Sequence, residues 1–160
     1  MQPLMITNLL RGYLYEINFV YRRLPAVLER VGMTSAVHRW GGFLKDQVGL
    51  IRGQQNALGD VVAMWGEGMR PCACAEVDEL LNEIHHALVA KGDHIAMERR
   101  VHEVFMALRK VVLARLDEGV QLARKLGEPE LAQRLETLFA DERAQDDQLT
   151  ETWVVGSERP

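Results

Sequence analysis

The chain has 160 residues, of which 48% are hydrophobic and 26% are charged, with 13 Gly, 5 Pro and 2 Cys. This composition excludes a disordered chain, a collagen-like repeat and a disulfide scaffold. The 19 basic and 23 acidic residues give a formal net charge of −4 and form no basic stripe along the sequence, which argues against nucleic-acid binding. We therefore expect a single domain over residues 1–160.

The sequence carries no sign of a membrane or secreted protein. No apolar run approaches the roughly 20 residues that span a bilayer. The first residues lack the basic start and the continuous apolar stretch of a secretory signal, so we expect a cytoplasmic protein. Cys72 and Cys74 are one residue apart and could close only a strained ring, so we expect them to be thiols.

Apolar residues at helical spacing predict two long helices in the first part of the chain. The first covers residues 8–31, with Asn8 and Gly32 as its caps and a kink at Pro25. Its inward face is Leu10, Tyr13, Ile17, Val20, Leu24, Val27 and Val31. The second covers residues 35–65, opens at Thr34 or Ser35, and includes two glutamines on its apolar face, Gln47 and Gln54.

The second part of the chain predicts three more helices, after a loop at residues 66–75 that contains two Gly and one Pro. A short helix over 76–91 ends at Lys91-Gly92, and a long one over 94–126 is capped by Asp93. The last helix, over 129–153, starts with Pro129 in its first turn and has Glu142 and Gln145 on its apolar face. Because no segment alternates with period two, the sequence predicts an all-α four-helix bundle with a crossover element.

Three short motifs resemble the ferritin-like YciE/YciF stress-protein family. They are Leu44-Lys45-Asp46-Gln47, the stretch from Cys74 to Leu80, and the stretch from Asp141 to Thr150. The similarity extends from about residue 9 to residue 153 with almost no gaps. The resemblance implies a ferritin-like four-helix bundle with a short extra helix in the connection between the second and third long helices.

Ferritin-like di-metal sites take carboxylates from all four long helices, because two hard cations need several anionic oxygens. The resemblance implies that Ile17 stands where the first helix would supply a glutamate, while Glu16 is rotated about 100° away. On the second helix, Lys45 and Val48 stand at the expected Glu and His positions, which leaves Asp46 alone.

The next long helix departs further, because Arg109, Lys110 and Val112 match the family's Glu/His/Glu cluster. Acidic residues are kept only in the last helix, at Asp141, Glu142 and Asp146. The expected function is therefore a stress-associated protein that has lost the di-metal site, needs no cofactor, and acts as a non-catalytic structural or interaction module.

The alternative is an iron- or manganese-binding, oxidase-like or storage protein with a rearranged site. Its candidate ligands are Glu16, Asp46, Glu98, His102, Glu142 and Asp146. Glu142 belongs either to that site or to a structural polar layer with Gln47, Gln54 and Gln145, since a buried carboxylate needs polar partners. In the polar layer, Glu142→Gln is expected to leave stability unchanged or to raise it. We expect Glu98 and His102 to form a surface pair.

Two other groups of residues are candidates for a metal site or a phosphotransfer site. Cys72 and Cys74, with Met64, Met69 and His85 nearby in sequence, are soft ligands that suit monovalent copper, but one Cys-x-Cys lacks a second pair, and we expect loop thiols. His85-His86 faintly resembles a phosphotransfer motif, with its lysine, Lys91, off the required face. The sequence has no catalytic triad, phosphate loop or dinucleotide fingerprint, so enzyme activity is left open and not favoured.

The number of apolar side chains predicts self-association. Three tryptophans and several apolar residues outside the predicted helix faces are more than one bundle needs to bury. They are Trp40, Trp65, Trp153, Leu9, Phe19 and Phe43. We expect a homodimer formed largely through the first two long helices, with no membrane or nucleic-acid partner.

Overall fold

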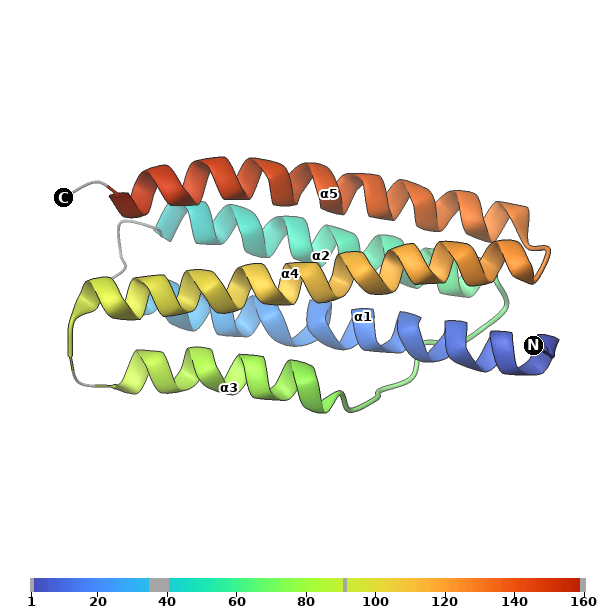
Figure 1. The fold of residues 1–160 in the computed structure, drawn as a ribbon, viewed down its shortest axis with the longest axis horizontal. Coiled ribbons are helices and arrows are strands. Elements are labelled where there is room, and N and C mark those ends of the chain that lie inside the picture. Colours follow the sequence, from blue (N-terminus) through green and yellow to red (C-terminus); the bar gives the residue numbers. More distant parts are fainter. Residues whose placement is uncertain (1, 35–40, 91, 159–160) are drawn as a thin grey trace.

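In the computed structural model the described residues are 2–34, 41–90 and 92–158, and they form five helices with no strand among them. The helices are α1 (Pro3–Met33), α2 (Gly41–Met64), α3 (Ala75–Val89), α4 (His94–Lys125) and α5 (Pro129–Glu158), as Figure 1 shows. The all-α prediction is therefore confirmed, with four long helices and the short one in the predicted place.

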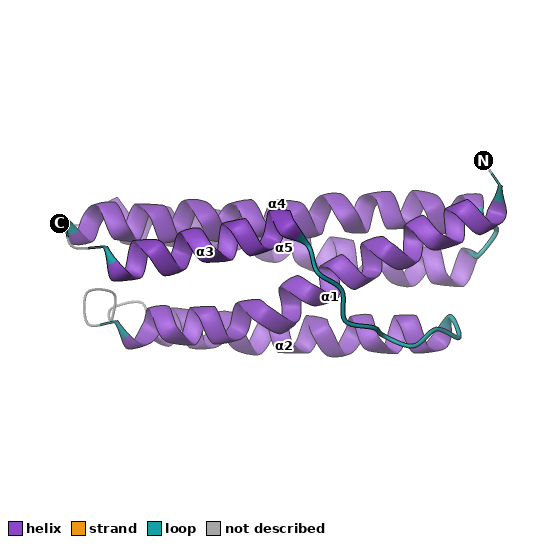
Figure 2. Ribbon diagram, turned by 90° about the horizontal axis from the view of Figure 1, so that it is seen from below, coloured by secondary structure: helices purple, strands orange, loops and turns teal. Residues whose placement is uncertain are grey.

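The four long helices form a bundle in which α1 and α5 each pack against both α2 and α4. Neighbouring long helices are antiparallel, and α3 lies outside the bundle against α1 and α4 (Figure 1). The loop at residues 65–74 leaves the end of α2 and runs back along the bundle to the start of α3, as Figure 2 shows. This crossover places α2 and α4 parallel on opposite corners of the bundle.

The ends of α1 differ from the sequence prediction. The helix begins at Pro3, whose missing N–H is harmless in a first turn, and Asn8 is internal. The Asn8 side chain accepts a hydrogen bond from Arg11 Nη1 at 3.0 Å and caps nothing. Gly32 is helical, and Thr34 is the C-cap residue. The helix continues without interruption through Pro25, and Figure 2 shows its first half sloping across the bundle before it runs beside α2.

The other boundaries agree with the prediction to within a few residues. Residues 35–40, where the second helix was expected to open, and Lys91 lie outside the described residues. Asp93 caps α4 as predicted, because its carboxylate accepts a hydrogen bond from the Ile95 N–H at 2.9 Å. The last helix continues to Glu158, five residues beyond the predicted end at residue 153.

The predicted helix faces supply most of the core, including Leu10, Ile17, Leu58, Leu108 and Leu135, each at most 1% exposed. The prediction for Phe19 was wrong, because this ring is buried within one chain. Since α1 contacts α2, α3 and α4, it buries more than a single face. Phe43 and Trp65 are half-buried, and Leu9 is exposed. The side chains of Trp40 and Trp153 lie outside the described ones.

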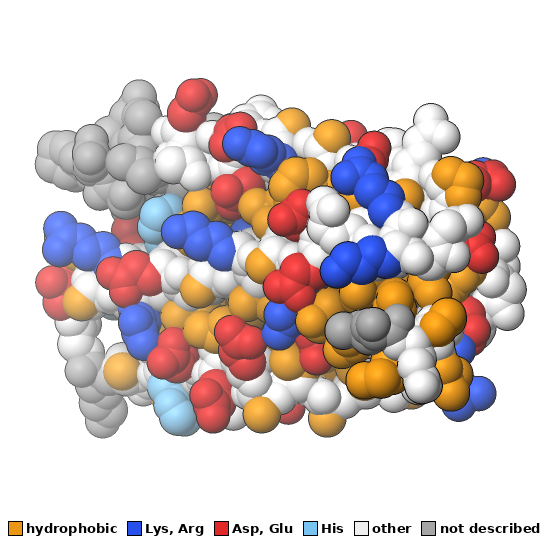
Figure 3. Space-filling view, turned by 45° about the vertical axis from the view of Figure 1, so that its right-hand side comes forward, with side chains coloured by type: hydrophobic (Ala, Val, Ile, Leu, Met, Phe, Trp, Pro, Cys, Tyr) orange, Lys and Arg blue, Asp and Glu red, His pale blue; other side chains and the backbone are white. Residues whose placement is uncertain are grey.

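None of the helices, as far as the structure describes them, is both long and apolar enough to cross a membrane. On the face drawn in Figure 3, acidic and basic side chains are interspersed over apolar ones.

Candidate functional site

The most distinctive polar feature of the interior joins three helices through Glu142 of α5. Arg109 of α4 approaches it, with Nη2 at 3.1 Å from Glu142 Oε2, and the same nitrogen donates to the Glu142 backbone oxygen at 3.2 Å. Tyr21 of α1 donates its hydroxyl to Glu142 Oε1 at 2.6 Å. The three side chains are 1–3% exposed, so water screens none of these contacts.

Helix periodicity explains why three polar side chains point inward. Arg109 follows Phe105 by four residues, and Tyr21 follows Ile17 by four, and both apolar residues are fully buried. Glu142 follows buried Leu138 by four residues. Each polar residue therefore occupies a core position of its helix, where the apolar neighbours one turn away fix its direction.

The surroundings shift the pKa values of two of these groups. Burial raises the pKa of the Glu142 carboxyl, while the Arg109 guanidinium and the Tyr21 hydrogen bond act in the opposite direction, and Asp146 adds to the rise. Burial, followed by the Glu142 charge, raises the pKa of Tyr21 well above 10.0. Tyr21 therefore keeps its proton at neutral pH and serves as a hydrogen-bond donor.

The residues of the predicted polar layer lie in or near this interior. Gln47 and Gln54 of α2 are buried, and Gln145 of α5 is half-buried. A cavity of about 320 Å³ between α2 and α5 is lined by Asp46, Gln47 and Gln145 among others. The side-chain oxygens of Gln47 and Gln145 are buried and have no hydrogen-bond partner among the described residues. The bundle interior is therefore polar over more than the Arg109–Glu142 pair alone.

The six residues of the alternative metal site do not converge. Glu16 pairs with Arg115 Nε at 2.7 Å, and Asp46 is exposed. The expected surface pair was wrong for Glu98, which is 5% exposed, because it lies three residues before buried Val101.

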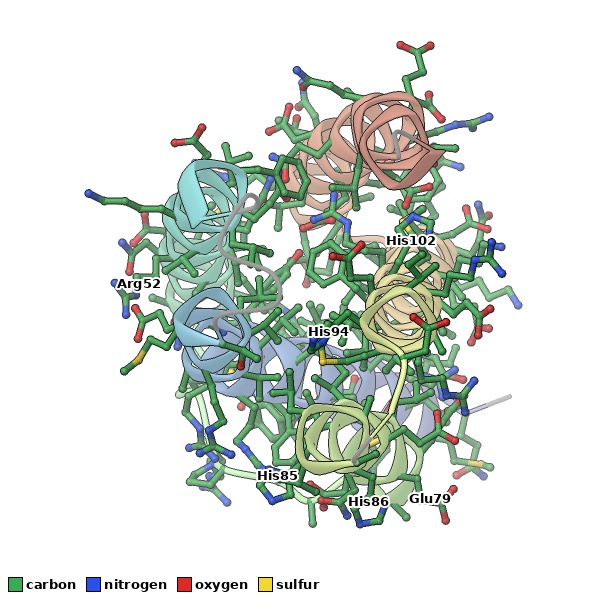
Figure 4. The ribbon with its side chains drawn as sticks, turned by 90° about the vertical axis from the view of Figure 1, so that its left-hand side faces the viewer. Arg52, Glu79, His85, His86, His94 and His102 are labelled. Carbon is green, nitrogen blue, oxygen red and sulfur yellow. The ribbon has the colours of Figure 1, made fainter. Side chains whose placement is uncertain are left out.

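His102 is half-buried on the side of α4 that faces α5 (Figure 4), and burial lowers its pKa. Asp146 lies near enough to Glu142 to affect its pKa. Across the part of the chain that is described, no group of three or more His, Cys, Asp or Glu side chains could hold a metal ion.

The Cys72 and Cys74 side chains are free thiols, as predicted. Burial raises the pKa of Cys72, and the charges of Glu16 and Cys74 add to the rise. A raised pKa keeps sulfur protonated at neutral pH, whereas both metal binding and nucleophilic attack use the thiolate. Cys74 is the N-cap residue of α3 but makes no side-chain cap bond. These thiols therefore have the environment of structural residues.

Comparisons with known proteins agree with this fold. The model of the domain of unknown function DUF892 matches residues 42–158. The chain belongs to the DUF892 family. Among solved structures it is similar to the stress protein YciF of E. coli, with a TM-score of 0.84 and 15% sequence identity over 97% of this chain and 98% of that one. The fold is therefore a ferritin-like helical bundle, as the sequence predicted. A search among curated proteins finds no match.

The DUF892 match covers α2 to α5 and so includes Arg109 and Glu142, but it leaves out Tyr21 on α1. Similarity to YciF covers nearly the whole chain and so extends the shared fold to α1. Sequence reasoning on this DUF892 protein placed Glu142 on an apolar helix face but missed its two partners. Arg109 lies four residues after buried Phe105, and Tyr21 lies four after buried Ile17. This spacing would have placed both in the core if polar side chains had been allowed at core positions.

Removing one member of the buried pair should be costly. We predict that Glu142→Gln lowers the free energy of unfolding by about 3 kcal/mol, since it leaves Arg109 buried without its counter-charge. This reverses the expectation from sequence, which did not include a buried cation beside Glu142. Arg109→Met should cost a similar amount, whereas the double variant Arg109→Met/Glu142→Gln should recover most of the loss, because neither charge is then left buried without its partner. Chemical denaturation of the four proteins measures the coupling.

The exposed pair Arg100–Glu83, which joins α4 to α3 at 2.9 Å, is the matched control for this cycle. Its coupling should stay below about 1 kcal/mol because solvent screens it. A coupling at Arg109–Glu142 no larger than in the control would contradict the assignment.

Tyr21 should also give the protein an alkaline dependence of stability. Its pKa is raised in the folded state. The resulting stabilisation is complete below pH 10 and is lost as the pH rises toward the folded-state pKa, at up to about 1.4 kcal/mol per pH unit. In Tyr21→Phe this contribution is absent, so the stability gap between parent and variant should narrow between pH 9 and pH 11. Parallel profiles over that range would exclude the effect.

Proposed function

We propose that this DUF892 protein is a stress-associated ferritin-like bundle in which Arg109 neutralises the interior carboxylate in place of metal ions. It would act as a non-catalytic structural or interaction module in the cytoplasm. The observation that carries the proposal is the ion pair between Arg109 Nη2 and Glu142 Oε2, 3.1 Å apart and inaccessible to water. The stress association rests on the similarity to YciF, which is described as a stress protein.

A fixed guanidinium at this position works against metal binding in two ways. It occupies the carboxylate that a cation would need, and its own positive charge repels a second cation in the same low-dielectric space. The hydrophobic side chains of Ile17 and Val112 fill positions where the family resemblance implies ligands, and both are at most 2% exposed. Hard metal ions need several oxygen ligands, so this donor set does not fit a di-metal centre.

The rearranged iron site has less support. Two of its acidic candidate ligands already form ion pairs, Glu16 with Arg115 and Glu142 with Arg109. Glu142 and Asp146 alone would give two carboxylates beside a cation.

Metal analysis of protein purified without chelator tests the proposal. We expect iron and manganese far below one equivalent per chain, the same content in Glu142→Gln, and no change of melting temperature on adding chelator. Removing a ligand lowers the melting temperature only when the ligand binds the native state more tightly than the unfolded state. Near-stoichiometric metal in the parent, lost both in the variant and on chelation, would favour the alternative.

We further propose that two chains associate through α1 and α2. A groove of about 580 Å³ lies between these helices, with apolar walls that include Leu28, Leu44 and Val48. Met33 at its edge is 86% exposed. On the other side of α1, α3 covers the bundle, so among the described residues this groove is the side of α1 and α2 left without a covering helix. A two-fold contact places the same patch against itself.

The rim of the groove suits such a contact because it carries both signs of charge, at Glu29, Lys45 and Arg52. Light scattering should therefore give a dimer at tens of micromolar, on the order of common dimer affinities. Gly49→Gln should shift the protein toward monomer, since Gly49 lines the groove and a Cβ there meets nothing within 4 Å in the single chain. Gly12→Gln, equally free of contacts on α1, is the control. A monomeric parent would refute the dimer.

A further inference from the structure

A second groove, between α1 and α3, has a different character. Its volume is about 380 Å³, and the polar side chains that line it are cationic or neutral. The polar side chains are Arg22, Arg23 and Arg30 from α1, with Asn82 and His85 from α3. Ala26, Val27 and Leu81 supply its apolar surface. No acidic residue is among the lining residues, although the whole chain has a formal net charge of −4.

The positive charges of this basic groove are poorly compensated. Arg30 Nη1 donates a hydrogen bond at 3.0 Å to His85 Nδ1, an uncharged acceptor that does not cancel the guanidinium charge. Figure 4 shows His85 on the α1 side of α3, while His86 points away. Arg23 pairs at 3.2 Å with Asp78, which stands outside the lining residues. The ion pairs found among the described residues include none that joins Arg22 or Arg30 to a carboxylate.

We propose that the basic groove binds a short, elongated anion that carries two or more phosphate groups. Guanidinium forks match phosphate oxygens and bind them through charge-assisted hydrogen bonds. Arg22 and Arg30 are eight residues apart, about 12 Å along α1, so a single phosphate would not fill the distance between them. A chain of phosphates would reach both, with Asn82 and His85 offering further hydrogen bonds from α3.

The surrounding charges favour a short ligand over a nucleic acid. Glu29 follows the groove on α1 and pairs with Arg52, and Asp78 of α3 pairs with Arg23 beside the groove. At physiological ionic strength salt largely screens exposed charges more than about 8 Å apart. The positive potential of the arginines therefore stays close to the groove, and these acids limit it further. A long polyanion leaving the groove would meet like charge.

Calorimetric titration of the full chain with inorganic tripolyphosphate tests the proposal. We expect saturable binding of one tripolyphosphate per chain, and binding of inorganic phosphate at least tenfold weaker. Arg22→Gln and Arg30→Gln should each weaken tripolyphosphate binding about tenfold, as expected for loss of a charge-assisted contact. Asp78→Asn should strengthen it, because Arg23 is then released toward the ligand.

Arg134→Gln is the matched control, because Arg134 is an exposed arginine on α5 that lines neither the basic groove nor the groove between α1 and α2. It should leave the affinity unchanged. All of these positions are exposed, so the variants should keep the parent's far-UV circular dichroism and melting temperature.

Four results would overturn the proposal. They are the absence of saturable binding, an equal loss of affinity in Arg134→Gln, binding of inorganic phosphate as tight as that of tripolyphosphate, and a single-stranded oligonucleotide that binds more tightly than tripolyphosphate. The second would mean general charge attraction, the third a single-phosphate site, and the fourth a nucleic-acid surface.

Discussion

The buried Glu142 carboxylate is the constraint on which the arrangement of the helices depends. An ionised carboxylate away from water is costly unless it is paired and hydrogen-bonded. Here the charge comes from Arg109 on α4 and the hydrogen bond from Tyr21 on α1, so one acidic group on α5 orders three helices at one level of the bundle. If α1, α4 or α5 slid or rotated, it would break a contact with Glu142 that water cannot replace.

The outer contacts hold the remaining elements to this frame with less energy. Arg11 of α1 makes two contacts with Glu67, Nε to Oε2 at 3.2 Å and Nη2 to Oε1 at 2.7 Å, and so ties the crossover loop to the bundle. Arg115 of α4 contacts Glu16 of α1 and lies over the Tyr13 ring. Because these groups are partly exposed, solvent reduces the contribution of each pair to stability. Their main effect is to fix where the loop lies and how α4 sits beside α1.

The sequence predicted the helices well because their faces are continuous apolar rows, such as Leu10, Ile17 and Leu24, which only a helix can align. It failed at Asn8, because a polar residue that often caps a helix can equally lie within one. It also failed for Glu98, Arg109 and Tyr21. A search for apolar spacing alone passes over polar residues at core positions, and the identity of their partners depends on how distant helices pack.

The basic groove could not be predicted for a related reason. Arg22 and Arg23 are adjacent, but neutral residues and Glu29 separate them from Arg30, so the chain shows no basic stripe. The groove exists only because the crossover loop returns the chain along the bundle and places Asn82 and His85 beside α1. Patterns within one helix are visible in the sequence, whereas a site shared by α1 and α3 depends on the path of the connection between them.

The stability of such a bundle depends on how the charge of its interior carboxylate is neutralised. When metal ions supply the positive charge, folding is coupled to metal concentration, because a ligand that binds only the native state adds to its stability. A guanidinium from the same chain is always present at a fixed ratio, so the fold becomes independent of metal supply. The cost is the desolvation of a second charge, which a close ion pair and the Tyr21 hydrogen bond offset only in part. Under this proposal the Glu142 carboxylate offers no open coordination position, and the binding function inferred here uses an outer surface, the groove between α1 and α3.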